Sequence, residues 1–171
     1  AGAYSWLGKP VQIATGAFEK TQISRINTDG KVQLPAISPD GKYVAYVSGE
    51  IGNQSLVVRQ VATDSIVTVV PPTNLNFSAV TFSPTGDHIY YCQTRSDFSV
   101  NTLYQVPTLG GTSKKLIEDV DSSVTFSPDG KQAVSAADEL RLWDISTGKE
   151  IRTLAKKYFK AVAFSGDGKR V

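Results

Sequence analysis

Short segments in which apolar and polar residues alternate run through most of this 171-residue chain, and turn-forming residues separate them. Such alternation predicts half-buried β-strands, and the turn signals recur about every ten residues. No segment carries the 3.6-residue period of a long helix. The pattern therefore predicts an all-β protein.

One turn signal occurs four times, at 38–42, 83–87, 127–131 and 165–169, and its serines are separated by 45, 44 and 38 residues. This period is typical of β-propeller blades. Pro presets φ in the turn, and Gly takes the φ > 0 position that closes a three-residue hairpin. An apolar strand that ends in Phe or Ile precedes each Ser, at 34–37, 80–82, 124–126 and 161–164. We interpret these strands as the inner strands of the blades, facing a shared core.

Three units of four strands follow from the same pattern. Unit one is predicted to end at Pro71-Pro72. The predicted strands are 34–37, 43–48, 55–61 and 65–70 in unit one, 77–83, 88–93, 102–106 and 112–117 in unit two, and 123–127, 132–135, 140–145 and 150–154 in unit three. Closed propellers have 4 to 8 blades. We therefore expect a β-propeller of four-stranded antiparallel blades, with about three complete blades and parts of a fourth, which leaves the ring incomplete.

Two regions are predicted along the chain. Residues 21–171 form the propeller repeats, with units starting near residues 32, 77, 121 and 160, and residues 21–26 supply an outer strand to the last blade. Residues 1–20 form a leader and linker. Small and aromatic residues at 1–8, followed by Lys9-Pro10, are the interfacial end of a membrane helix that precedes residue 1, or else a disordered leader.

Charge and cysteine content narrow the choice of partners. Eighteen basic and sixteen acidic residues give a formal net charge of +2, too balanced for a nucleic-acid footprint, so we expect no nucleic-acid partner. The single cysteine, Cys92, excludes an internal disulfide and a multi-cysteine zinc site. Because it lies in an apolar strand, we expect a buried, inert thiol.

The sequence contains no recognisable catalytic constellation. Its one histidine, His88, begins a strand, and no Gly-x-Ser-x-Gly elbow occurs. The Asp-Gly pairs lack the companion carboxylates that calcium requires. We therefore expect a protein that is not an enzyme, with no catalytic residue, no cofactor and no metal.

The units resemble two kinds of propeller repeat. The turn at 38–42, followed by Tyr43-Val44-Ala45-Tyr46-Val47, resembles TolB-type repeats. Residues 140–145 (Leu-Arg-Leu-Trp-Asp-Ile), followed by Thr147-Gly148-Lys149, are similar to a WD repeat. A WD repeat carries Gly-His before its first strand, where this chain has residues 156–159. Without that His, we expect Asp144 to be a turn residue.

Residues 1 to about 131 also resemble bacterial transmembrane serine/threonine kinases, on the run 1–7, Ile23-Ser24-Arg25, the turn at 38–42 and residues 103–111. In those proteins a cytoplasmic kinase precedes one membrane helix and an extracytoplasmic propeller. The resemblance implies a membrane tether upstream of residue 1 and a periplasmic or cell-surface location. A cytoplasmic location is the alternative.

Exposed loops on a rigid scaffold are where propellers bind. The loops 49–53 and 94–100 are expected to share one face with the connections between units. The predicted function is noncatalytic recognition of a protein, peptide or glycan on this face, through Arg95, Phe98 and Tyr158. By the resemblance to the kinases, the chain would be the extracytoplasmic sensor part of a membrane receptor kinase. Two alternatives are self-assembly of copies into a ring or fibre, and an accessory propeller of a peptidase.

Overall fold

The computed structural model describes residues 31–94, 100–120, 123–136 and 138–171, and in these residues the chain is all-β. The first sheet, in the order β1-β2-β3-β4, contains β1 (Val32–Ile37), β2 (Tyr43–Glu50), β3 (Asn53–Gln60) and β4 (Ile66–Thr73). The second sheet, in the order β5-β6-β7-β8, contains β5 (Asn76–Phe82), β6 (His88–Thr94), β7 (Asn101–Pro107) and β8 (Lys114–Glu118). The third sheet, in the order β10-β11-β12, contains β10 (Gln132–Ala136), β11 (Leu140–Asp144) and β12 (Lys149–Ala155). The strand β9 (Ser123–Phe126) lies beside β10 and completes the third blade.

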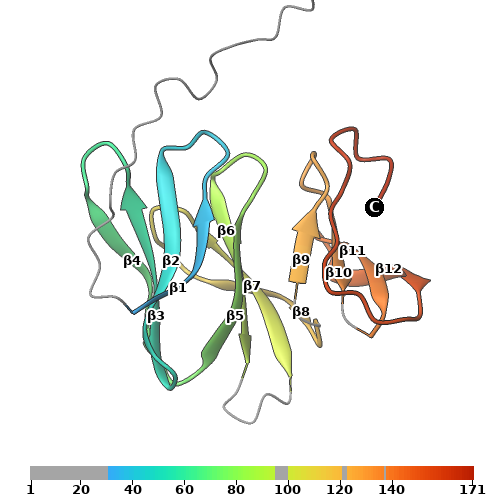
Figure 1. The fold of residues 1–171 in the computed structure, drawn as a ribbon, viewed down its shortest axis with the longest axis horizontal. Helices are drawn as coiled ribbons and strands as arrows, with labels where there is room; N and C mark the ends of the chain where they lie inside the picture. Colours follow the sequence, from blue (N-terminus) through green and yellow to red (C-terminus); the bar gives the residue numbers. More distant parts are fainter. Residues whose placement is uncertain (1–30, 95–99, 121–122, 137) are drawn as a thin grey trace, which may run out of the picture.

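All the paired strands are antiparallel, and the three sheets stand side by side like successive blades (Figure 1). The predicted fold class, an incomplete propeller of antiparallel blades, is therefore confirmed. Two strand predictions are wrong. Pro71-Pro72 does not end the first unit, because both prolines lie inside β4, an edge strand where a missing N–H is tolerated. Residues 161–164 form no strand, and none of the described strands pairs with them. The predicted strand 21–26 and the leader 1–20 lie outside the described residues.

All four repeat turns share the same two backbone hydrogen bonds, and in each the serine hydroxyl donates to an aspartate, which lies two residues on except in the second turn, where it is Asp87. In the first, Ser38 N donates to Tyr43 O at 2.9 Å and Gly41 N donates to Ser38 O at 2.9 Å. The Ser38 hydroxyl donates to Asp40 Oδ1 at 2.7 Å and accepts from Tyr43 N at 2.9 Å. Gly41 has φ +71°, the left-handed region that the sequence predicts for it. The loop holds four residues between Ser38 and Tyr43, one more than the predicted three-residue hairpin.

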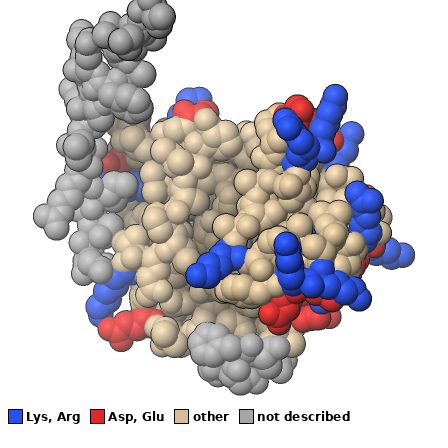
Figure 2. Space-filling model, turned by 45° about the vertical axis from the view of Figure 1, so that its right-hand side comes forward, with Lys and Arg blue, Asp and Glu red and all other residues tan. Residues whose placement is uncertain are grey.

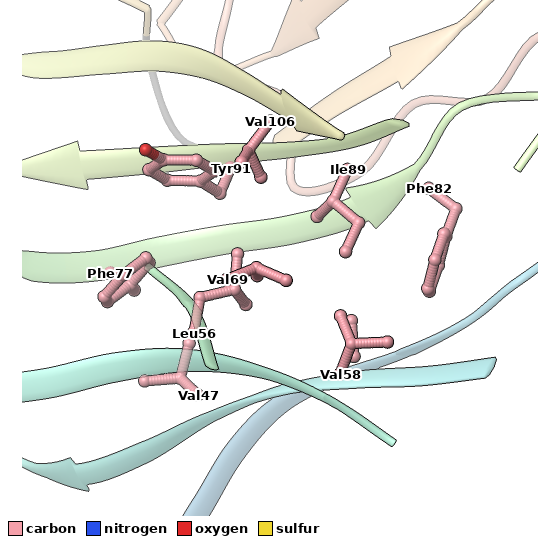
Figure 3. Packing of buried hydrophobic residues seen from close by; sticks show 10 residues of the cluster. Val47, Leu56, Val58, Val69, Phe77, Phe82, Ile89, Tyr91 and Val106 are labelled. Carbon is pink, nitrogen blue, oxygen red and sulfur yellow. The ribbon is translucent and has the colours of Figure 1, made fainter. Parts of the chain in front are cut away.

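The blades are held together by apolar side chains between the sheets. Figure 3 shows the first cluster, in which Val47, Leu56, Val58 and Val69 of the first sheet face Phe77, Phe82, Ile89, Tyr91 and Val106 of the second. A second cluster joins the second and third blades. There the rings of Tyr90 and Phe126 stack with centroids 4.0 Å apart.

The residue before the turn serine is packed against a neighbouring blade in the second and third blades but not in the first. Phe82 is 7% exposed and Phe126 is stacked on Tyr90, because each packs against the preceding blade. Ile37 holds the same position in the first blade but is 66% exposed, since no sheet precedes β1 in the described residues. The outer face of the first blade is therefore open at this position.

Candidate functional site on the loop face

The turn between β2 and β3 lies on the same side of the molecule as the connection between the first two blades. Gly52 N, in that turn, donates to Asn76 Oδ1 at the start of β5, at 3.1 Å. Beside it, Phe77 N donates to the buried side-chain oxygen of Gln54 at 2.9 Å. These bonds confirm the expectation that the first of these loops shares a face with the connection between units, and we call this side the loop face.

A hollow of about 510 Å³ opens on the loop face, where β6 ends and β7 begins. It is lined by Leu75, Gln93, Thr94, Val100, Thr102, Tyr104, Lys115 and Glu118. Antiparallel register explains this grouping, because Gln93 lies opposite Thr102 and Tyr104 lies opposite Lys115. Opposed residues point to the same side of a sheet, so their side chains gather there.

Two polar side chains in the wall of the hollow have atoms without a hydrogen-bond partner. Gln93 Nε2 and Thr94 Oγ1 are both buried and have no hydrogen-bond partner, and their residues are only 7% and 3% exposed. Asn76 Nδ2, on the strand paired with Thr94, is in the same situation. A buried polar group that makes no hydrogen bond costs about 1–3 kcal/mol. The hollow thus holds hydrogen-bonding capacity that the described residues do not use.

Charge and aromatic surface complete the lining. Lys115 and Glu118 form an ion pair in β8, and the hydrogen bond between them raises the pKa of Lys115 and lowers that of Glu118. The ring of Tyr104 stacks on Tyr91 with centroids 5.3 Å apart and planes 13° apart. Burial raises the pKa of Tyr91. The lining of the hollow can therefore donate and accept hydrogen bonds beside an aromatic ring, a combination suited to binding a ligand.

Of the three predicted partner-binding residues, the structure describes Tyr158 alone. Arg95 and Phe98 lie outside the described residues. Tyr158 is 66% exposed in the segment after β12 and does not line the hollow. Sequence reasoning missed Gln93 and Thr94. The signal for them was two polar residues that directly follow the apolar run of β6.

The one described histidine is not set up for nucleophilic catalysis. Its Nδ1 lies 3.1 Å from Asp87 Oδ1, and the same oxygen accepts from the Ser83 hydroxyl at 2.8 Å. In a hydrolytic triad the imidazole lies between the serine and the carboxylate. Here the carboxylate lies between the other two, and Ser83 is buried in its turn. Asp87 therefore accepts hydrogen bonds within its turn, as the aspartates of the other turns do.

The WD-like segment has a structural role. Asp144 Oδ1 accepts hydrogen bonds from the Ser146 hydroxyl at 2.6 Å and from Thr147 N at 2.8 Å, which caps the turn that follows β11. Trp143 Nε1 donates to Ser135 Oγ at 2.9 Å in the interior of the third blade. The expectation that Asp144 is a turn residue is confirmed.

Cys92 is fully buried, and burial raises the pKa of its thiol to about 12, so the thiol has the inert character that the sequence predicts. No cluster of three or more potential metal ligands occurs among the described residues. Within the same residues no helix is long and apolar enough to cross a membrane.

Comparison with known proteins supports the fold assignment. No protein-family model matches the sequence. The chain is 30% identical over 126 residues to a TolB homolog of Chlorobium chlorochromatii strain CaD3, a match that covers 67% of this chain and 26% of that protein. The crystal structure of TolB from Acinetobacter baumannii matches with a TM-score of 0.66 and 25% identity, over 81% of this chain and 36% of that chain.

Two further solved structures share the fold at lower identity. The β-propeller domain of the Trilobed protease from Pyrococcus furiosus matches with a TM-score of 0.59 and 16% identity, over 75% of this chain and 43% of that chain. Dipeptidyl peptidase 4 from Porphyromonas gingivalis matches with a TM-score of 0.58 and 14% identity, over 71% of this chain and 24% of that chain.

The fold and these likenesses define a β-propeller. More narrowly, the fold is that of a TolB-like propeller. The chain spans about a quarter of the curated TolB homolog and about a third of the TolB structure.

Proposed function

We propose that this chain is part of a noncatalytic propeller that recognises a protein, peptide or glycan at the hollow on its loop face. The unpartnered Gln93 Nε2 and Thr94 Oγ1 carry the proposal, because a ligand that hydrogen-bonds them would remove the cost of leaving them unsatisfied. In the wider protein, the propeller would be the extracytoplasmic sensor of a membrane receptor kinase, as the resemblance of residues 1 to about 131 suggests.

Filling the hollow tests the binding site. Thr102 lies in the lining, so Thr102→Trp places a large ring where the ligand would lie. Thr112→Trp is the matched control, because Thr112 is exposed and does not line the hollow. Peptide and glycan arrays should retain the unaltered chain and Thr112→Trp but not Thr102→Trp. Equal retention of all three proteins would overturn the proposal that the ligand binds in the hollow.

The sensor role can be tested by reading which domains the gene encodes before and after this sequence. A kinase domain followed by one apolar helix upstream of residue 1 supports it. A hydrolase domain downstream would instead support an accessory propeller of a peptidase, the function to which the likeness to dipeptidyl peptidase 4 points.

A second candidate function is self-assembly, and the 66% exposure of Ile37 favours it. A second copy could cover this side chain as the first blade covers Phe82. Native mass spectrometry decides this point, because a uniform monomer of 18.4 kDa excludes both ring and fibre.

A further inference from the structure

Positive charge is concentrated in β12 and the segment that follows it. Residues 149–160 contain Lys149, Arg152, Lys156, Lys157 and Lys160, against one acidic residue, Glu150. These twelve residues therefore carry a formal charge of +4, while the whole chain carries +2. Figure 2 shows Lys and Arg side chains gathered on the side of the molecule that belongs to the third blade.

None of the five cations forms an ion pair with a carboxylate among the described residues. All five side chains are exposed. Some cations elsewhere are used within the fold, since Arg59 pairs with Asp64 and Arg141 with Glu139. The charge of residues 149–160 is thus available to a partner.

Apolar and aromatic groups lie among these cations. Ile151 is 46% exposed and Tyr158 is 66% exposed. Lys157 Nζ lies 5.3 Å from the centroid of the Phe159 ring, a cation–π distance. β12 is also the last strand of its sheet, so one edge of its backbone is unpaired in the described structure. The surface combines charge with apolar contacts and an open backbone edge.

We propose that this basic edge, formed by Lys149, Ile151, Arg152, Lys156, Lys157 and Tyr158, binds an acidic peptide segment of a protein partner. Carboxylates would meet the unpaired cations, and apolar side chains of the same segment would cover Ile151 and Tyr158. A single-stranded nucleic acid fits less well, because it needs several stacking rings along a basic groove, and Tyr158 is one exposed ring. The surface is separate from the hollow, so the two proposals stand or fall independently.

The probe is a fluorescein-labelled peptide of about ten residues that alternates Glu or Asp with Leu, long enough to follow β12 in extended form. Anisotropy should rise with the unaltered chain. A peptide with Gln in place of the acids should bind at least about tenfold more weakly, and added salt should weaken the acidic peptide, because screening shortens the reach of exposed charges.

Two double variants separate the basic edge from net charge. Lys156→Glu with Lys157→Glu should weaken binding at least about tenfold. Lys114→Glu with Lys131→Glu changes the net charge equally, at exposed residues that are not part of the basic edge, and should leave binding within about twofold. Tyr158→Ala should weaken binding severalfold at every salt concentration, because it removes an apolar contact. Circular dichroism checks that each variant is folded.

Three results would overturn the proposal. Absence of binding to the acidic peptide would leave the lysines with the role of protecting a sheet edge from aggregation. Equal losses in the two double variants would show that only net charge acts. Tighter binding of oligo-dT, or of vesicles containing phosphatidylserine, would assign the surface to a nucleic acid or to a membrane.

Discussion

Pro39 of the first repeat turn lies against Gly86 of the second, so that a Cβ atom added at Gly86 would lie 3.4 Å from Pro39 Cδ. The relationship recurs between Pro84 and Gly130 at 3.8 Å, and between Pro128 and Gly168 at 3.2 Å. Each turn therefore rests on the one before it, and the proline of the motif has a second role as a contact between blades. A Cβ atom added at Gly41 would meet no atom within 4 Å beyond its chain neighbours, which agrees with the open face at Ile37.

The first prediction compares two residues at the same position of the repeat. Phe82→Ala should lower the free energy of unfolding by about 3–5 kcal/mol, because it leaves a cavity between the first two blades. Ile37→Ala should change it by no more than about 0.5 kcal/mol, because Ile37 is 66% exposed. Urea unfolding followed by circular dichroism measures both. A large loss for Ile37→Ala would show that this side chain is covered in solution.

The second prediction compares two glycines with similar φ. Gly41 (φ +71°) and Gly148 (φ +67°) are both left-handed, so Ala costs about 1 kcal/mol of backbone strain at either position. At Gly148 the added Cβ would also lie 2.3 Å from the carbonyl oxygen of Leu116 in β8, while at Gly41 it meets nothing. Gly148→Ala should therefore be clearly the more destabilising in chemical unfolding. Equal losses would contradict the contact between the second and third blades.

The sequence allowed the strands and turns to be predicted, because period-two alternation and Pro-x-Gly turns are local signals. It did not reveal the hollow, since the hollow forms only where the register of three strands brings Gln93, Thr94 and Thr102 near Leu75. Ile37 illustrates the same limit. Its sequence context matches that of Phe82, but its exposure depends on a neighbouring sheet, which no local pattern encodes.

The third prediction concerns the interior of the third blade. Ser135→Ala removes the acceptor for Trp143 Nε1 and leaves a buried donor unpartnered, because Trp143 is only 6% exposed. The expected loss is about 1–3 kcal/mol of unfolding free energy. Ser135→Thr keeps a hydroxyl acceptor and separates loss of the hydrogen bond from loss of the side chain. Wild-type stability in Ser135→Ala would show that the hydrogen bond contributes nothing.

The fourth prediction concerns acid stability. The Ser38 hydroxyl is the main cause that lowers the pKa of Asp40 from 3.8 to about 2, with Lys42 contributing further. A carboxyl whose pKa is lower in the folded state stabilises the fold above its ordinary pKa, and this contribution is lost as the pH falls from 3.8 toward 2. Ser38→Ala should raise the pKa of Asp40 and reduce the loss of stability across that window, as measured by carboxyl NMR titration and by unfolding at several pH values. Ser146→Ala, whose hydroxyl lowers the pKa of Asp144 instead, is the control and should leave Asp40 unchanged. If the pKa of Asp40 stayed near 2 in Ser38→Ala, its acidity would come from Lys42 rather than from the serine that every repeat turn contains.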